Sequence, residues 1–379
     1  MKVRLGDYIE EYSVRNKKGE DIPVYSVTNT QGFCKDYFGK EVASKDKKTY
    51  KIVPRGCFAF NPSRINVGSV DWQRNEERVI VSPLYNVFSV SEQLDQQYLY
   101  YYLKSDFALQ RIRAVAPGSV RDNLKLAMLY EFPIELPEIT EQRIIVDKLD
   151  RVKQIISLRE KEVQALDDLI KARFVEMFGD PVDNPIGWKT KTLQELVSDD
   201  CTISYGIVQT GDDQEEGIPV FRPVDIVNHI PVRTELKRTT EEISSRYKRT
   251  ILKGREMLIT VRSNIADTCI VGEEFVGCNV GRGIVPIRTK EDEMVLEFLK
   301  YQIDSKHLND NIKALAKGIT LIQLNMEDLR EISLIVPPIE IQKVYVEFTK
   351  QVDKSKAVIQ KSLDETQLLF DSLMQKYFG

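Results

Sequence analysis

The chain repeats itself at an offset of 200 residues, and this internal repeat limits its possible folds more than any other feature. Ungapped matches join the middle of the chain to its end: Pro137 with Pro337, Gln142 with Gln342, Val152 with Val352, Leu169 with Leu369, and Gly179 with Gly379. The same offset holds upstream, where Leu99 matches Leu299 and Gly118 matches Gly318. Solenoid repeats have periods of about 20 to 50 residues, so this period indicates two duplicated domains in tandem. We therefore expect approximate two-fold symmetry within one chain.

The composition is that of a soluble globular protein of two or three domains. Of its 379 residues, 42% are hydrophobic and 30% are charged. No run approaches the roughly 18 apolar residues of a membrane span, and the N-terminal sequence lacks the apolar segment of a signal peptide. We therefore expect a cytoplasmic protein. The five cysteines form no CxxC motif, which favours reduced thiols over a metal site or a disulfide framework.

Each copy of the repeat begins with a strand-rich region and continues into helices. Short runs of β-branched and aromatic residues start near Ile22, Tyr50 and Arg78, and the second copy has comparable runs. Helical patches follow at 96–112 and 296–312. Strands that precede helices in this way, without βαβ alternation, predict an α+β fold.

A long helix with a heptad pattern is expected at the end of each copy. From Ile145, and from Tyr345 in the second copy, a 4-3-4-3 spacing selects mostly apolar positions, which is typical of a coiled-coil seam. Neither stripe can be buried alone, so we predict that the two helices pack antiparallel and form a spacer of roughly 50 Å. The predicted seam consists of Ile145, Leu149, Val152, Ile156, Val163, Leu166 and Ile170 in the first helix, and Val352, Ile359, Leu363, Phe370 and Leu373 in the second.

The two copies follow one order of segments. A globular region is followed by P-x-I-x-x-Q at Pro137, which opens a long helix ending in Phe178-Gly179. A second globular region then begins with G-W-x-x-x-x-L at Gly187, and the same helix returns between Pro337 and Gly379. This order resembles the specificity (S) subunit of type I restriction-modification systems. In the second copy Ile341 replaces Glu141, so the usual Glu-Gln pair of the motif is incomplete there.

The resemblance implies a non-catalytic subunit that needs no cofactor. It implies two target recognition domains, at 1–136 and 180–336, each reading one half of a bipartite DNA sequence. It also implies two conserved helices, at 137–179 and 337–379, that set the spacing and dock two methyltransferase (M) subunits. A restriction (R) subunit would join the complex where one is present.

Each globular region offers a matched basic segment that could contact double-stranded DNA. Around a shared glycine, Arg55-Gly56 to Arg64-Ile65-Asn66 aligns with Lys253-Gly254 to Arg262-Ser263-Asn264 at an offset of 198. Arginine and asparagine suit guanine and adenine edges in the major groove, whereas lysines suit phosphates. The candidate DNA-binding residues are Lys45, Lys47, Lys48, Lys51, Arg55, Arg64, Asn66, Arg246, Lys248, Arg249, Arg262 and Asn264. For any one of them, a solvated surface position is the simpler interpretation.

Other functional classes have less support in the sequence. The two histidines, His229 and His307, have no counterparts in the other copy, no phosphate-binding loop is present, and Gly281-Arg282-Gly283 lacks the strand-turn-helix setting of a dinucleotide site. We therefore expect neither catalysis nor a metal site. The net charge of −4 is concentrated in the second copy, which leaves a two-headed coiled-coil scaffold that binds proteins as the alternative.

The two globular regions have diverged more than the helices, because they align only in fragments while the helices match without gaps. Two identical readers on a two-fold frame would recognise a palindrome. Different readers predict an asymmetric, two-part target.

Overall fold

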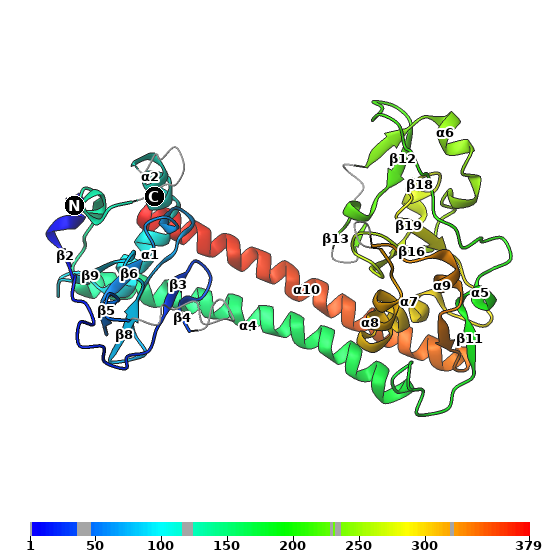
Figure 1. Cartoon of the computed structure of the whole chain (residues 1–379), viewed down its shortest axis with the longest axis horizontal. Helices are drawn as coiled ribbons and strands as arrows, with labels where there is room; N and C mark the ends of the chain where they lie inside the picture. The colour runs from blue at the N-terminus through cyan, green and yellow to red at the C-terminus, as the bar shows by residue number, and fades with distance from the viewer. Residues whose placement is uncertain (1, 36–46, 116–123, 228–229, 232–235, 319–321) are drawn as a thin grey trace. The chain divides into compact units, whose positions relative to one another are not determined.

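A computed structural model describes residues 2–35, 47–115, 124–227, 230–231, 236–318 and 322–379. The chain divides into two compact units (Figure 1). The first unit consists of Met1–Lys161 and Gln360–Gly379, and the second of Glu162–Ile359. Each unit is therefore built from one globular region and from parts of both long helices.

The globular region of the first unit is a mixture of short antiparallel sheets and helices. Its largest sheet has the strand order β2-β9-β6-β7. The other strands form three separate two-stranded sheets, β5-β8, β3-β4 and β1-β10. The elements are β1 (Lys2–Arg4), β2 (Ile9–Glu11), β3 (Ser26–Thr28), β4 (Gly32–Cys34), β5 (Lys51–Pro54), β6 (Phe58–Phe60), β7 (Val70–Trp72), β8 (Arg78–Val81), β9 (Asn86–Val90), α1 (Gln96–Lys104), α2 (Asp106–Val115), α3 (Leu126–Leu129) and β10 (Pro133–Glu135).

The globular region of the second unit has two three-stranded sheets, ordered β17-β16-β19 and β15-β12-β18, with the pairs β13-β14 and β11-β20. The β12-β18 pairing is parallel, whereas the described pairs of named strands in the first unit are antiparallel. The elements are β11 (Thr190–Thr192), α5 (Leu193–Leu196), β12 (Ile218–Phe221), β13 (Ile226–Val227), β14 (Ile230–Pro231), β15 (Lys237–Thr239), α6 (Glu241–Ser245), β16 (Glu256–Thr260), β17 (Thr268–Val271), β18 (Asn279–Val280), β19 (Ile284–Ile287), α7 (Leu296–Asp304), α8 (Lys306–Ala314), α9 (Met326–Arg330) and β20 (Ser333–Ile335).

The predicted helical patches are each broken into two helices at a matched serine. Ser105 separates α1 from α2, and Ser305 separates α7 from α8. The Ser105 hydroxyl donates to the Tyr102 carbonyl at 2.7 Å and accepts from the Ala108 amide at 3.2 Å, so it ends one helix and caps the next. Ser305 makes the same bond to the Gln302 carbonyl at 2.6 Å.

The two long helices are α4 (Ile139–Phe178) and α10 (Ile339–Phe378), and a buried glutamine fixes the start of each. The Gln142 amide accepts from the Asp95 backbone at 2.8 Å and donates to the Gln93 and Pro137 carbonyls at 2.9 Å each. Gln342 accepts from Val295 and donates to Glu293 and Pro337. The glutamine of the P-x-I-x-x-Q motif therefore ties each helix to the chain just before α1 or α7 (Figure 1).

A phenylalanine near the C-terminus of each long helix packs against the globular region of the other repeat. In the first unit, Phe378 of α10 packs on Tyr98 of α1, with ring centres 5.0 Å apart. In the second unit, Phe178 of α4 packs on Phe298 of α7 at 4.7 Å. Because Tyr98 matches Phe298 and Phe178 matches Phe378, these are equivalent contacts made twice. Each unit thus contains the start of the long helix of its own repeat and the end of the long helix of the other repeat. These two helical segments run antiparallel.

The predicted seam positions point away from solvent to different degrees. Ile145, Leu149, Ile170 and Val352 are buried, and the other eight predicted seam residues are half-buried. Polar residues in the same stripe bond across to the other helix: Arg159 donates to the Ser362 carbonyl and the Thr366 hydroxyl in the first unit, and Lys356 pairs with Asp167 at 2.5 Å in the second. Such pairs fix the register of neighbouring helices.

Candidate nucleic-acid interface

The matched basic segments begin at equivalent glycine turns. Gly56 has φ of 86° and Gly254 has φ of 91°, both in the left-handed region that favours glycine. The turns lead into β6 and β16, the central strands of the largest sheet in the first unit and of the β17-β16-β19 sheet in the second. The basic residue before each glycine is held by its own unit, since Arg55 donates to the Asn75 and Glu76 carbonyls at 3.2 Å and Lys253 pairs with Asp200 at 2.7 Å.

The Arg-x-Asn loop of the first unit leaves its arginine exposed. Arg64 precedes the single-turn helix Ile65–Val67, and its side chain has no hydrogen bond or ion pair with any other described residue. Asn66 is half-buried, and its carbonyl accepts from Arg113 at 3.3 Å. Among the described residues of the first unit, this loop therefore presents an exposed guanidinium group without a partner.

The corresponding loop of the second unit contains two non-glycine residues in the left-handed backbone conformation. Ser263 and Ala266 have φ of 61° and 65°. Non-glycine residues keep this left-handed conformation only where surrounding contacts hold the backbone in it. The contacts include bonds from the Ala266 amide to the Thr260 carbonyl at 2.9 Å and from the Asp267 amide to the Asn264 carbonyl at 3.2 Å. Arg262, at the start of this loop, is half-buried, and Asn264 is exposed.

The upstream basic residues differ in how far they are engaged. Lys51 donates to the Tyr85 carbonyl at 2.7 Å, and burial lowers the pKa of its ammonium group. Arg246 pairs with Glu242 at 2.5 Å. Among the remaining candidates, Lys48, Lys248 and Arg249 are exposed, Lys47 is half-buried, and Lys45 lies outside the described residues.

Sequence reasoning did not find the residues that surround Arg262. Its Nε lies 2.8 Å from Oε1 of Gln323, and Nη2 donates to the same oxygen. Arg282 lies nearby, with its guanidinium carbon 6.0 Å from the ring centre of Tyr205. The only local signal was the arginine between two glycines in Gly281-Arg282-Gly283, because the other residues are far apart in sequence.

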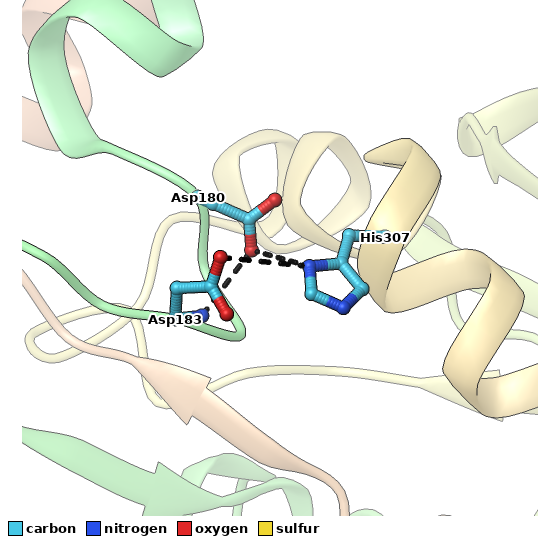
Figure 2. A group of neighbouring side chains, drawn as sticks. All are labelled: Asp180, Asp183 and His307. Atoms are coloured by element: carbon cyan, nitrogen blue, oxygen red, sulfur yellow. Dashed lines mark hydrogen bonds and ion pairs between the residues drawn. The ribbon is translucent and has the colours of Figure 1, made fainter.

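His307 lies in a cluster with two carboxylates of the loop that follows α4 (Figure 2). Its Nδ1 is 3.1 Å from Oδ1 of Asp180 and 3.9 Å from Oδ2 of Asp183. The same Asp180 oxygen accepts from the Val182 amide at 2.9 Å, so the cluster closes the loop against α8. The three ligand atoms lie within 4.8 Å of one another, but all three side chains are open to solvent, and we assign them a structural role. The other histidine, His229, lies outside the described residues.

The described helices include none that is both long enough and apolar enough to cross a membrane. The long helices α4 and α10 owe their length to the seam, and charged residues occur throughout both.

Comparison with known proteins connects both copies of the repeat to one family. The family model for the type I restriction modification DNA specificity domain matches residues 3–167 and again residues 185–367. The EcoBI specificity subunit of Escherichia coli is 25% identical over 297 residues, covering 71% of this chain and 62% of that subunit. The StySPI specificity subunit of Salmonella potsdam is 19% identical over 399 residues, covering 98% of this chain and 84% of that subunit.

Solved structures share the fold. A chain from a structure describing complex assembly and conformational transition of the type I R-M system superimposes with a TM-score of 0.64 at 20% identity, covering 100% of this chain and 97% of that one. The type I restriction-modification S subunit from M. genitalium has a TM-score of 0.55 at 14% identity, covering 100% and 96%. The expected α+β fold with its duplicated domain and long helices is therefore confirmed. With two matches of the family model that together span most of its length, this chain belongs to the type I restriction-modification DNA specificity family.

Proposed function

We propose that this chain is the DNA-sequence specificity subunit of a type I restriction-modification complex and has no catalytic activity of its own. The observation that carries the proposal is the double match to the specificity domain on a duplicated frame. The globular regions 1–136 and 180–336 each read one half of a bipartite, asymmetric target, and the helical segments 137–179 and 337–379 hold the two readers at a set spacing. The complex works on cytoplasmic DNA.

The divergence of the two readers supports an asymmetric target. In the first globular region, the exposed Arg64 follows β6 of an antiparallel sheet, whereas the second region contains a parallel strand pair and has left-handed residues at Ser263 and Ala266 after Arg262. Side chains presented on different backbones meet different base edges, and a few bidentate contacts of about 1 to 3 kcal/mol each are enough for specificity.

The long helices carry a repeated apolar surface suited to two copies of one partner. On α4, Ile144, Leu158 and Leu169 are 55%, 52% and 46% exposed, and their matched residues on α10, Val344, Val358 and Leu369, are 59%, 70% and 51% exposed. Within each helix the spacings of 14 and 11 residues correspond to about four and three turns, so the three side chains share one face. Each set of three exposed apolar side chains, called a stripe below, provides separate contact points along its helix, and the same three positions recur in both repeats. The partner in this proposal is a methyltransferase subunit bound once to each stripe.

Two measurements test the proposal. The full chain, expressed with a methyltransferase subunit of its own system, should direct methylation to a split sequence, whereas the purified chain alone should transfer no methyl groups from S-adenosylmethionine. Binding of the complex to DNA should weaken steeply as salt rises, because phosphate contacts release counterions. A complex that does not bind DNA, and whose subunit contacts do not depend on salt, would identify the chain as a protein-binding scaffold.

A further inference from the structure

Four backbone segments of the second unit meet beside the Arg262 loop. Ile207 bridges to Gly281, and its amide donates to the Val280 carbonyl at 2.8 Å. The Val261 amide donates to the Gly283 carbonyl at 2.8 Å, and Arg262 bridges to Gln323. Side chains from four distant parts of the sequence therefore come together on one edge.

The glycines at this crossing are required by close approach. A Cβ at Gly206 would lie 1.8 Å from the Val280 carbonyl oxygen, and one at Gly283 would lie 2.5 Å from Cγ of Pro223. These contacts fix Tyr205 beside the turn that joins β18 to β19, and they place Arg282 in that turn. Arg282 is exposed, and Tyr205 is 37% exposed, so the stacked pair faces solvent.

The guanidinium group of Arg262 is held in one orientation with donors to spare. Gln323 Oε1 accepts from both Nε and Nη2, which leaves Nη1 and one hydrogen of Nη2 without a partner in the described structure. Those two donors form the end of the planar fork, which matches the O6 and N7 acceptors of guanine. Next to it, the Val261 amide bonds to the Gly283 carbonyl and Arg262 itself bridges to Gln323, so the backbone at the base of the same side chain is held on both sides.

Neither arginine is neutralised within the described part of the unit. Arg222, Arg246 and Arg288 each pair with a carboxylate, but no described carboxylate forms an ion pair with Arg262 or Arg282. Burial and, to a smaller extent, the positive charge of Arg282 lower the pKa of Arg262. A surface that keeps two unpaired cations together is built for a ligand rich in acceptors.

We propose that Arg262, positioned by Gln323, reads a guanine in the half-site of the second unit, and that Arg282 on Tyr205 contacts the neighbouring phosphate. This inference rests on the proposed function, because it assigns roles within the same DNA interface. Gln323 acts as a positioning residue, since its oxygen is used by Arg262.

The test begins with the split sequence methylated by the wild-type chain together with its methyltransferase, mapped across the host genome. Arg262→Lys keeps the charge and loses the fork, so it should relax one guanine position in one half-site while the other half-site stays unchanged. On DNA duplexes carrying the mapped sequence, discrimination at that position should fall by roughly 5- to 150-fold. Gln323→Met should relax the same position although it removes no charge, which is an effect that general loss of stability would not produce.

Arg282→Gln should weaken binding to all sequences alike and reduce the salt slope by about one. Lys306→Gln is the matched control, because Lys306 is an exposed cation of the same unit that pairs with Asp310, and its loss should change neither property. Co-purification with the methyltransferase and thermal unfolding establish that each variant is folded.

The outcomes separate the two levels of the proposal. A wild-type complex without any split motif would overturn the proposed function itself. A wild-type split motif that Arg262→Lys and Gln323→Met leave intact would overturn only the guanine assignment, and uniform weakening by Arg262→Lys would show a phosphate contact in its place.

Discussion

A buried glutamine secures the start of each long helix, and its side-chain amide makes hydrogen bonds to backbone groups. Gln142→Leu and Gln342→Leu should each lower the free energy of unfolding by roughly 2 to 4 kcal/mol, since buried backbone donors and acceptors are left unpaired. Urea unfolding of the full chain measures the change. Gln154→Leu, at an exposed position of α4, is the matched control and should alter stability by less than about 0.5 kcal/mol. An equally small effect at Gln342 would contradict the prediction.

Lys104 gives the first unit a dependence on pH. Its ammonium group donates to the Asn29 carbonyl at 3.0 Å and to the Gly68 carbonyl, and burial lowers its pKa to about 8. The unfolded chain keeps the ordinary value near 10.5 and therefore binds the proton more tightly. Stability from this group should be lowest below pH 8 and should rise as the pH increases from about 8 to 10.5.

The comparison of wild type with Lys104→Met isolates that contribution from other titrations. The difference in unfolding free energy should be constant below pH 8 and should move in favour of wild type above it, by at most about 3 kcal/mol. Urea unfolding at several values between pH 7 and 10 measures it. A difference that moves toward the variant as pH rises would show that the ammonium is not desolvated.

Single residues were also where prediction from sequence was weakest. Arg55 and Arg262 both lie in the two segments that match around Gly56 and Gly254. In the structure, Arg55 donates to backbone carbonyls, whereas Arg262 has donors left without a partner among the described residues. The difference depends on partners such as Gln323, 61 residues away, and no local pattern encodes such a contact. Arg282 was visible only as an arginine between glycines, because the close approach that requires those glycines involves a distant strand.

At the scale of elements, the end of each long helix packs in the globular region of the other repeat, and this arrangement can be tested by substitution. Phe378→Ala should destabilise the first unit by about 3 to 5 kcal/mol and leave the second unit unaffected, because the ring packs on Tyr98 and Tyr102. Phe178→Ala should do the reverse through Phe298 and Tyr345. The two tryptophans, Trp72 and Trp188, lie in different units, so variants with one tryptophan report each unit separately by fluorescence.

Leu368→Ala is the control for this exchange, since Leu368 is on the same helix and 69% exposed. Loss of stability in the second unit on Phe378→Ala would contradict the pairing described above.

The exposed stripes of α4 and α10 make a second prediction for the helices. Leu158→Glu with Leu169→Glu should remove one methyltransferase from the complex, Val358→Glu with Leu369→Glu should remove the other, and all four changes should remove both. Mass measurement of the purified complex counts the subunits. Charged residues at these positions are costly only when a partner covers them, so the stability of the free chain should change little. Unchanged stoichiometry in all three variants would exclude the stripes as docking sites.

For the whole molecule, the long helices could be predicted closely because their signal is local and repeated. The expected segments 137–179 and 337–379 contain the observed helices Ile139–Phe178 and Ile339–Phe378. The globular regions were predicted only as strand-rich, because which strands pair depends on contacts between distant segments, such as β1 with β10 and β11 with β20. The order of the segments alone does not predict the two units, because each unit includes the C-terminal part of the long helix that belongs to the other repeat.

That division predicts how half of the chain should behave. Residues 1–179 lack α10, so the surface formed by Tyr98 and Tyr102 loses Phe378. Phe178 matches Phe378, and a second copy of the half-chain can therefore supply the missing ring. The half-chain should form a homodimer, measured by analytical ultracentrifugation, and with its methyltransferase it should recognise a palindromic sequence, because both readers are then identical. A folded monomer would contradict this expectation.

The polar seam residue Arg159 sets the strength of that homodimer. In the full chain its guanidinium group bonds to Thr366, but the matched residue in the half-chain is Leu166, which offers no acceptor. The half-chain dimer should therefore dissociate more readily than the helices of the full chain separate, since the half-buried guanidinium group loses the Thr366 hydroxyl and keeps only a backbone carbonyl like that of Ser362. Arg159→Leu should tighten the half-chain dimer, lowering its dissociation constant by roughly tenfold or more, and should weaken or leave unchanged the helix pairing of the full chain. Sedimentation of both half-chain forms over a range of concentrations, with urea unfolding of both full chains, measures these opposite effects, and an equal response in the two contexts would show that Arg159 has no role in pairing the two different helices.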